Sequence, residues 1–359
     1  MVMKYIQHSP SSSQSLAQSA PSSLHQSVPQ SQPLSSPLPQ AQYWRGVVLC
    51  IVATILTGGM FPVMTDALTH IDPFTFTSLR YLIAGLGFVT VLWLKEGMAG
   101  FARDGESFLA VWVLGSIGFC GFGSLVFLGQ QLAGDQGALV ASIMMATQPM
   151  MGLLLNSILR RTRPAPLSLI FVAFSFFGVA LVITRGHVLA ALHSPQHYAA
   201  NLLIVVGALC WVVYTFGAAR FTRWSTLKYT TLTVWFALPT IVSLNLILIG
   251  THAIAKPSMA SLISIVPDLI YMAPIAGFAA IFCWTTGNRI LGPMNGVLFM
   301  DIVPITAFVV SAMTGVVPTR VQIAGVAITG MALLLNNFYL RRRSSPRVVA
   351  PRATSLKSV

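Results

Sequence analysis

The chain has 359 residues, of which 55% are hydrophobic and only 8% are charged, and its mean hydropathy is +0.76. A soluble domain carries roughly 25% charged residues, so the composition excludes an ordinary soluble fold and favours one integral membrane bundle. The formal net charge of +13 suits a nucleic-acid partner only if the basic residues gather on one surface, and their positions along the chain indicate otherwise.

Ten apolar segments follow one another, and most are long enough to cross about 30 Å of hydrocarbon as helices. They are residues 46–67, 74–94, 108–131, 137–158, 167–184, 199–219, 229–250, 267–287, 292–314 and 321–340. The segments form two matching sets of five, at 46–184 and 199–340. Because five is odd, the sets must have opposite orientations. We therefore expect an all-α integral membrane protein of ten transmembrane helices, arranged as two inverted five-helix repeats, as in many secondary transporters.

Lys and Arg residues predict the orientation. If the N-terminus is cytoplasmic, only Arg185, Lys256 and Arg320 fall on the outside, Arg80 lies within a span, and all other Lys and Arg lie inside. This asymmetry follows the positive-inside rule. It predicts a plasma membrane protein, in the inner membrane of a bacterium, with both termini cytoplasmic. The basic residues are then topology anchors, and no nucleic-acid partner is expected.

The two ends of the chain differ from the spans. Residues 1–45 are rich in Ser, Gln and Pro, a composition that predicts a disordered cytoplasmic tail. Residues 341–359 form a basic tail suited to the anionic cytoplasmic leaflet. The four cysteines lie inside predicted spans without a CxxC pattern, so neither a disulfide framework nor a metal site is indicated. No cofactor is expected.

The fourth span of each half carries the same spacing of Gly and Pro. Gly137 precedes Pro149 by the same interval that separates Gly292 from Pro304. Gly and Pro are common in membrane helices, but the shared order of elements favours a duplicated ancestor.

The chain resembles the EamA-type transporters of the drug/metabolite transporter superfamily, over about residues 46–340. The matching stretches are Gly58-Gly59-Met60-Phe61, Asp72-Pro73, Leu79-Arg80-Tyr81, Cys210-Trp211-Val212-Val213-Tyr214 and the helices of Pro149 and Pro304. Thr57 stands where family members often carry Trp. The resemblance implies two five-helix halves around a central cavity that opens alternately to each side, and a small-metabolite substrate that is often exported.

Two ionisable residues lie deep inside predicted spans, away from the span ends, where charges are expensive and tend to be functional. Arg80 is a candidate anchor for a carboxylate-bearing substrate; the alternatives are a structural tie to neighbouring helix ends and snorkelling to the interface. Asp301 lies near mid-membrane and is a candidate for proton coupling, because burial of a carboxylate favours its protonation. Its alternatives are a salt bridge with Arg80, a counter-charge for an amine, and a satisfied carboxylate in the bundle.

Polar and aromatic pairs at helical spacing supply further candidates for the cavity wall. Gln148 lies on a Met-rich face of the fourth span, and Trp211 and Tyr214 are neighbours in the sixth. Trp284 pairs with Asn288, and Phe127 with Gln131. Helix packing is the alternative for each.

Gating candidates are the glycines and prolines within spans. They are Gly58, Gly59, Pro62, Pro149 and Pro304, for which close helix packing is the alternative.

We therefore expect a secondary transporter of a small metabolite, amino-acid-like or amphipathic, that works by alternating access as an efflux permease, with proton coupling left open. Alternatives are an intramembrane enzyme and a channel or scramblase. The chain lacks an HExxH or Walker A sequence, and its seven histidines fall in tails or loops. The expected partners are the substrate and the lipid bilayer, with the protein as a monomer or homodimer.

Overall fold

The structure is a computed structural model, and it describes residues 40–159, 161, 166–184, 195–313, 315 and 319–344. The predicted N-terminal tail lies outside these residues except for its last part, which is helical. The first helix therefore begins at Gln40, earlier than the apolar pattern predicts. At the other end the last helix continues to Ser344, and the rest of the basic tail lies outside the described residues.

All regular structure within the described ranges is helical. The α-helices are α1 Gln40–Ala67, α2 Pro73–Glu96, α3 Phe108–Gly115, α4 Phe122–Leu132, α5 Gly137–Met145, α6 Gln148–Leu159, α7 Pro166–Thr184, α9 Pro195–Gly217, α10 Thr226–Gly250, α11 Met259–Ser264, α12 Val266–Met272, α13 Ala280–Leu291, α14 Pro293–Gly296, α15 Ile302–Met313 and α16 Arg320–Ser344. Short 3₁₀ or π turns are η1 Gly97–Phe101, η2 Ser116–Gly121, η3 Gly134–Gln136, η4 Ala218–Arg220, η5 Pro274–Ala279 and η6 Val297–Asp301.

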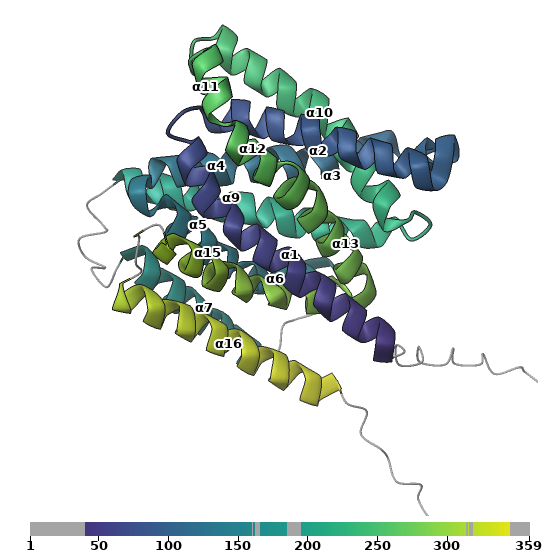
Figure 1. Cartoon of the computed structure of the whole chain (residues 1–359). Coiled ribbons are helices and arrows are strands. Elements are labelled where there is room, and N and C mark those ends of the chain that lie inside the picture. The colour runs from purple at the N-terminus through teal and green to yellow at the C-terminus, as the bar shows by residue number, and fades with distance from the viewer. Residues whose placement is uncertain are drawn as a thin grey trace, which may run out of the picture. The chain divides into compact units, whose positions relative to one another are not determined.

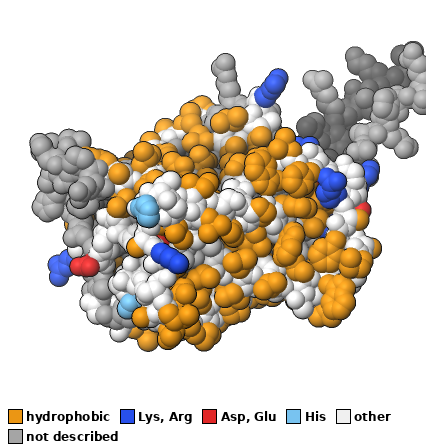
Figure 2. All heavy atoms as spheres, turned by 90° about the horizontal axis from the view of Figure 1, so that it is seen from above, with side chains coloured by type: hydrophobic (Ala, Val, Ile, Leu, Met, Phe, Trp, Pro, Cys, Tyr) orange, Lys and Arg blue, Asp and Glu red, His pale blue; other side chains and the backbone are white. Residues whose placement is uncertain are grey.

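Eight helical stretches in the described part of the chain are long and apolar enough to cross a membrane, and they coincide with eight of the predicted spans. The predicted spans 167–184 and 321–340 fall on α7 and α16, whose apolar stretches are shorter, Pro166–Gly178 and Arg320–Asn336. Large apolar side chains such as Leu86, Leu94 and Leu246 are exposed, and apolar side chains cover most of the face in Figure 2. This is the surface expected of helices that face lipid.

Local sequence explains where several helices begin and end. The Asp72 side chain accepts hydrogen bonds from the backbone N–H groups of Phe74 and Thr75, both at 2.9 Å, so it caps α2 ahead of Pro73, as such residues commonly do. Gly134 and Gly292 follow α4 and α13 with φ of 65° and 83°. Glycine adopts this left-handed backbone without the steric penalty of a side chain.

Helices distant in sequence pack in pairs. In the first half, α1 packs on α13 and α15, and in the second half α9 packs on α4, α5 and α6. The pairs α2–α10 and α7–α16 join equivalent spans of the two predicted repeats, and α7 lies beside α16 in Figure 1. These contacts place the inner faces of α1, α2, α4, α9 and α13 around one buried core.

Four of the predicted spans are interrupted within the described residues. π-turns η2 and η5 interrupt the third and eighth predicted spans. The fourth span breaks between α5 and α6, directly before Pro149, and the ninth changes to the 3₁₀ turn η6 before Pro304. Proline lacks a backbone N–H and cannot continue the helical hydrogen-bond ladder, and π-turns frequently mark functional sites. The interruptions surround the central cavity.

Candidate functional site: a central cavity

A small cavity lies between α1, α2, α4, α9, α13 and the broken fourth and ninth spans. Its wall is made by Thr57, Met60, Arg80, Tyr81, Phe122, Met145, Gln148, Trp211, Ala276, Ala280, Ile281, Trp284 and Met300. The volume of the cavity that the centre of a water-sized sphere can occupy is about 20 Å³. This is about the space that one water molecule needs. A ligand larger than a water molecule would need the cavity to widen.

Arg80 is the one cationic residue among the described residues of this wall. The residue is only 2% exposed, and its Nε–H donates to the backbone carbonyl of Met272 at 3.0 Å. Met272 ends α12 just before the π-turn η5, where the regular helical hydrogen bonds are interrupted. Its carbonyl is therefore free to accept from the Arg80 guanidinium. The predicted tie of Arg80 to a neighbouring helix end is thus present.

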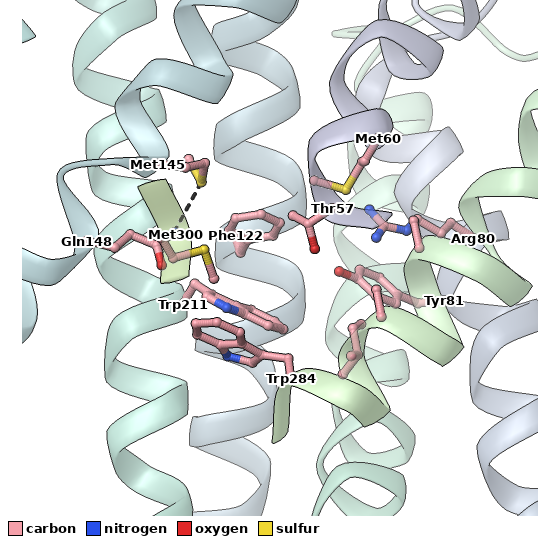
Figure 3. A pocket seen from close by; sticks show the side chains of 13 residues that line it. Thr57, Met60, Arg80, Tyr81, Phe122, Met145, Gln148, Trp211, Trp284 and Met300 are labelled. Atoms are coloured by element: carbon pink, nitrogen blue, oxygen red, sulfur yellow. Dashed lines mark hydrogen bonds between the residues drawn. The ribbon is translucent and has the colours of Figure 1, made fainter. Parts of the chain in front are cut away.

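The rest of the guanidinium faces the cavity. Its carbon lies 5.1 Å from the ring centroid of Tyr81 and 5.6 Å from that of Phe127, distances at which cation–π attraction acts. Nη1 is buried and has no hydrogen-bond partner among the described groups. In Figure 3 the fork points toward Thr57 and Met60. Within the described side chains no carboxylate pairs with it, so a donor stays available for an anion.

Two indoles form one side of the cavity. Trp211 from α9 and Trp284 from α13 lie one above the other in Figure 3, and Trp211 packs on Phe122 with ring centroids 5.2 Å apart. The indole N–H of Trp284 donates to the Thr215 hydroxyl at 3.1 Å. Aromatic walls of this kind bind apolar parts of a ligand.

Gln148 stands across the cavity from Arg80 (Figure 3). It begins α6, and its amide Nε2 lies 3.1 Å from the sulfur of Met145. Its Oε1 is buried with no partner in the described structure. The cavity thus has a cation on one side, an unpaired amide oxygen on the other, and aromatic and Met side chains between them.

The structure brings together four of the predicted residues, Arg80, Gln148, Trp211 and Trp284, and places others elsewhere. Tyr214 is fully buried behind the wall, where it stacks on Tyr229 with centroids 5.2 Å apart.

Asn288 and Gln131 also lie away from the central cavity. Asn288 lines a separate cleft, and Gln131 is exposed and lines a surface pocket near Lys256. The backbone of Asp301 ends η6 beside Met300 of the cavity wall, but its side chain lies outside the described part of the structure.

The predicted gating residues are packed at helix contacts. A Cβ added at Gly58 would lie 2.5 Å from Cβ of Thr306 and 2.7 Å from the carbonyl oxygen of Val303, so α1 and α15 meet here. Gly59 faces Tyr271, whose hydroxyl donates to the Leu56 carbonyl at 2.8 Å. Pro62 lies inside α1.

Pro149 and Pro304 are both buried just after the helix breaks. Gly58 and Gly59 therefore lie at close helix contacts, which is the packing alternative for these residues. Their role in gating stays a prediction.

A larger cleft adjoins the cavity at the end of the bundle where α1 begins. It has about 320 Å³ of room, and its wall is Thr215, Ala218, Ala219, Thr222, Thr226, Tyr229, Thr285, Asn288, Arg289, Gly292 and Pro293. Trp284 lines the cavity and Thr215 lines the cleft, so their hydrogen bond forms the partition between the two spaces.

Several wall residues had no signal in the sequence pattern. Phe122 and Met145 are apolar residues at spacings that fit packing equally well. Met60 and Tyr81 belong to stretches that carry the resemblance, and Thr57 directly precedes one, but nothing in their spacing pointed to the cavity. Gln130 was also missed: it is 1% exposed and bridges two helices, whereas its neighbour Gln131 is exposed.

Long apolar helices around a buried internal cavity define a helical membrane protein. The EamA-like transporter family matches residues 44–184. The chain is 33% identical to the "Uncharacterized transporter YrdR" of Bacillus subtilis (strain 168), over 89% of this chain and 99% of that protein. It is 23% identical to the "Uncharacterized transporter YyaM" of the same organism, over 82% of this chain and 94% of that protein.

The chain therefore belongs to the EamA-like transporter family, as its motifs predicted. A crystal structure of another protein matches 83% of this chain and 98% of its own with a TM-score of 0.58 at 21% identity, a likeness that supports the fold alone. The transporter names of the two relatives favour transport over catalysis for this chain.

Proposed function

We propose that the protein is a secondary transporter that binds a small carboxylate-bearing metabolite with an apolar part, such as an amino acid, in the central cavity. The observation that carries the proposal is the buried Arg80 fork with its unpaired Nη1 at the cavity wall. Arg pairs with carboxylates through planar, charge-assisted hydrogen bonds. The two indoles and the methionines would hold the apolar part.

The size of the cavity, which has room for about one water in this structure, supports alternating access. Substrate entry then requires the helices around the cavity to separate at one end at a time. The proposal includes ten spans in two inverted repeats. It is supported by the matching pairs α1–α13 and α9–α4, and by the interruptions of equivalent spans at η2 and η5. Export as the direction follows the family resemblance.

The decisive experiment is transport by the purified full-length protein in proteoliposomes, with a pooled amino-acid and metabolite mixture read by mass spectrometry. We expect saturable, trans-stimulated accumulation of one class of carboxylate-bearing compound. Flux without saturation would indicate a channel instead. Absence of flux from folded protein with every carboxylate tested would contradict the proposal.

Proton coupling is a separate part of the proposal and rests on Asp301. Its backbone adjoins Met300 of the cavity wall, and a carboxylate at this depth is a natural proton carrier. We expect Asp301→Asn to abolish uptake driven by an imposed pH gradient while leaving substrate exchange measurable. Retention of gradient-driven uptake in Asp301→Asn would remove Asp301 from coupling.

A further inference from the structure

Two buried amides occupy equivalent places at opposite ends of the bundle, and only one of them bridges two helices. Gln130 of α4 donates from Nε2 to the Phe61 carbonyl at 2.7 Å and to the Thr65 hydroxyl at 2.8 Å. These bonds join α4 to α1 and close that end. Asn288 of α13 instead donates to the carbonyl of Trp284 in its own helix, at 2.9 Å, and lines the open cleft.

Landmarks in the backbone establish the equivalence of α4 and α13. One offset along the chain carries Ser116, the start of one π-turn, to Pro274, the start of the other. The same offset carries Gly134 to Gly292, the two glycines with positive φ that follow the helices. Gly137, which the Gly–Pro spacing paired with Gly292, has a helical φ of −54° and is not the counterpart in backbone conformation. Both features are structural, so they align the two helices without reference to side-chain type.

The same offset aligns a close packing contact. It carries Gly129 to Gly287, where added Cβ atoms would lie 2.6 Å from the carbonyl of Ala200 in α9 and 3.1 Å from the carbonyl of Gly46 in α1. Each glycine is followed directly by an amide, Gln130 in one helix and Asn288 in the other. The helices therefore pack alike and present their amides toward opposite partners.

The glycine contacts also align α1 with α9. The offset that carries Gly46 to Ala200 carries the two Gln130 partners, Phe61 and Thr65, to Thr215 and Ala219. Both counterparts line the cleft together with Asn288. The cleft is thus the space in which a second copy of the Gln130 bridge would form.

We propose that Gln130 and Asn288 are reciprocal gate residues, and that Asn288 bridges α13 to the Thr215 carbonyl when its end of the bundle closes. This inference rests on the alternating access of the proposed function. As in the Gln130 bridge, the amide nitrogen is the donor, and the amide oxygens of Gln130 and Asn288 are alike buried without a partner in the described structure. The inference accounts for Ala219 in place of Thr65, because the shorter Asn side chain needs a closer approach of α9, which the smaller Ala219 side chain permits.

The test uses two reporter cysteines at equivalent positions, in the full chain in lipid nanodiscs. Ala218 lines the cleft, and the same offset relates it to Met64, which is fully buried at the closed end. Each reporter is labelled with a water-soluble maleimide, and the labelling of the parent chain is subtracted. Labelling of Ala218→Cys then reports the opening of the cleft end, and labelling of Met64→Cys reports the opening of the opposite end.

We expect the two gate substitutions to move the reporters in opposite directions. Gln130→Ala should raise labelling of Met64→Cys roughly two- to tenfold and lower that of Ala218→Cys, because loss of a bridge shifts the equilibrium by about one hydrogen bond. Asn288→Ala should lower labelling of Met64→Cys. The state that is open at the Met64 end is closed at the cleft end, and it is this state that loses the Asn288 bridge. Gln130→Met keeps the side-chain volume without a donor and should act as Gln130→Ala does.

Matched controls separate gating from loss of structure. Asn295 donates to the Leu291 carbonyl at 2.9 Å, as Asn288 does to Trp284, but does not line the cleft. Asn295→Ala and Gln131→Ala should leave both reporters unchanged. Unchanged reporters in Asn288→Ala, or a rise of Met64→Cys labelling there, would overturn the inference. Opposite shifts without substrate flux in proteoliposomes would uphold the gate and refute the proposed substrate.

Discussion

The central cavity and the cleft beside it share a partition but differ in size and chemistry. The cavity has about 20 Å³ of room and is lined by indoles, methionines and one guanidinium, whereas the cleft has about 320 Å³ and is lined largely by hydroxyl and small side chains. Selective binding needs close contact and unpaired polar groups, while passage needs room and weak contacts. Under the proposed function, this difference assigns recognition to the cavity and makes the cleft a vestibule.

The largest effect is expected from Arg80→Lys. Lysine keeps the charge but loses the planar fork that reaches the Met272 carbonyl while facing the cavity. We expect substrate uptake in proteoliposomes to fall at least tenfold, with normal insertion. Arg103→Lys is the matched control, since Arg103 also lies over an aromatic ring, Phe108, but on an exposed loop. Full activity of Arg80→Lys would show that charge alone acts in the cavity.

Removal of the partition should cost stability. Trp284→Ala deletes a buried indole and its hydrogen bond to Thr215, and substitutions of this kind lower the free energy of unfolding by about 3 kcal/mol. Denaturant unfolding of the purified protein in detergent measures this. Trp93 is 56% exposed, so Trp93→Ala should change stability little. Equal effects at the two sites would mean that the partition is not a packed structure.

Close packing of α1 on α15 should make Gly58→Ala destabilising by about 1–3 kcal/mol, because the new Cβ meets Thr306 and the Val303 carbonyl. An added Cβ at Gly330 of α16 meets nothing within 4 Å, so Gly330→Ala should be neutral or stabilising. Thermal unfolding of both variants compares them. A stable, active Gly58→Ala would show that this contact is loose enough to move freely.

The smallest effect on stability is expected from Gln148→Met, which removes the unpaired Oε1 and keeps the volume. We expect a change within about 1 kcal/mol, together with an altered preference among substrates in competition uptake. Gln130→Met removes two helix-bridging hydrogen bonds and should be the more costly of the two. The opposite order would mean that Gln148 supports the fold rather than the cavity.

The sequence predicted the family from its motifs and most helix positions from hydropathy, and it singled out Arg80, which the structure buries. It did not resolve which face of a helix meets the cavity. Adjacent residues on a helix differ by about 100°, and this separates buried Gln130 from exposed Gln131. Trp211 and Tyr214 share a face, yet one lines the cavity and the other stacks on Tyr229. Only the positions of neighbouring helices decide such cases.

The pairing of α7 with α16 has a consequence for synthesis. The buried face of α7 carries Ser168, Ser175 and Gly178, and the Thr329 hydroxyl of α16 lies 3.3 Å from the carbonyl of Ser175. At roughly 5–20 residues per second, α16 leaves the ribosome on the order of ten seconds after α7. During that delay the small polar face of α7 lacks its partner helix, and the pairing is completed only when α16 arrives.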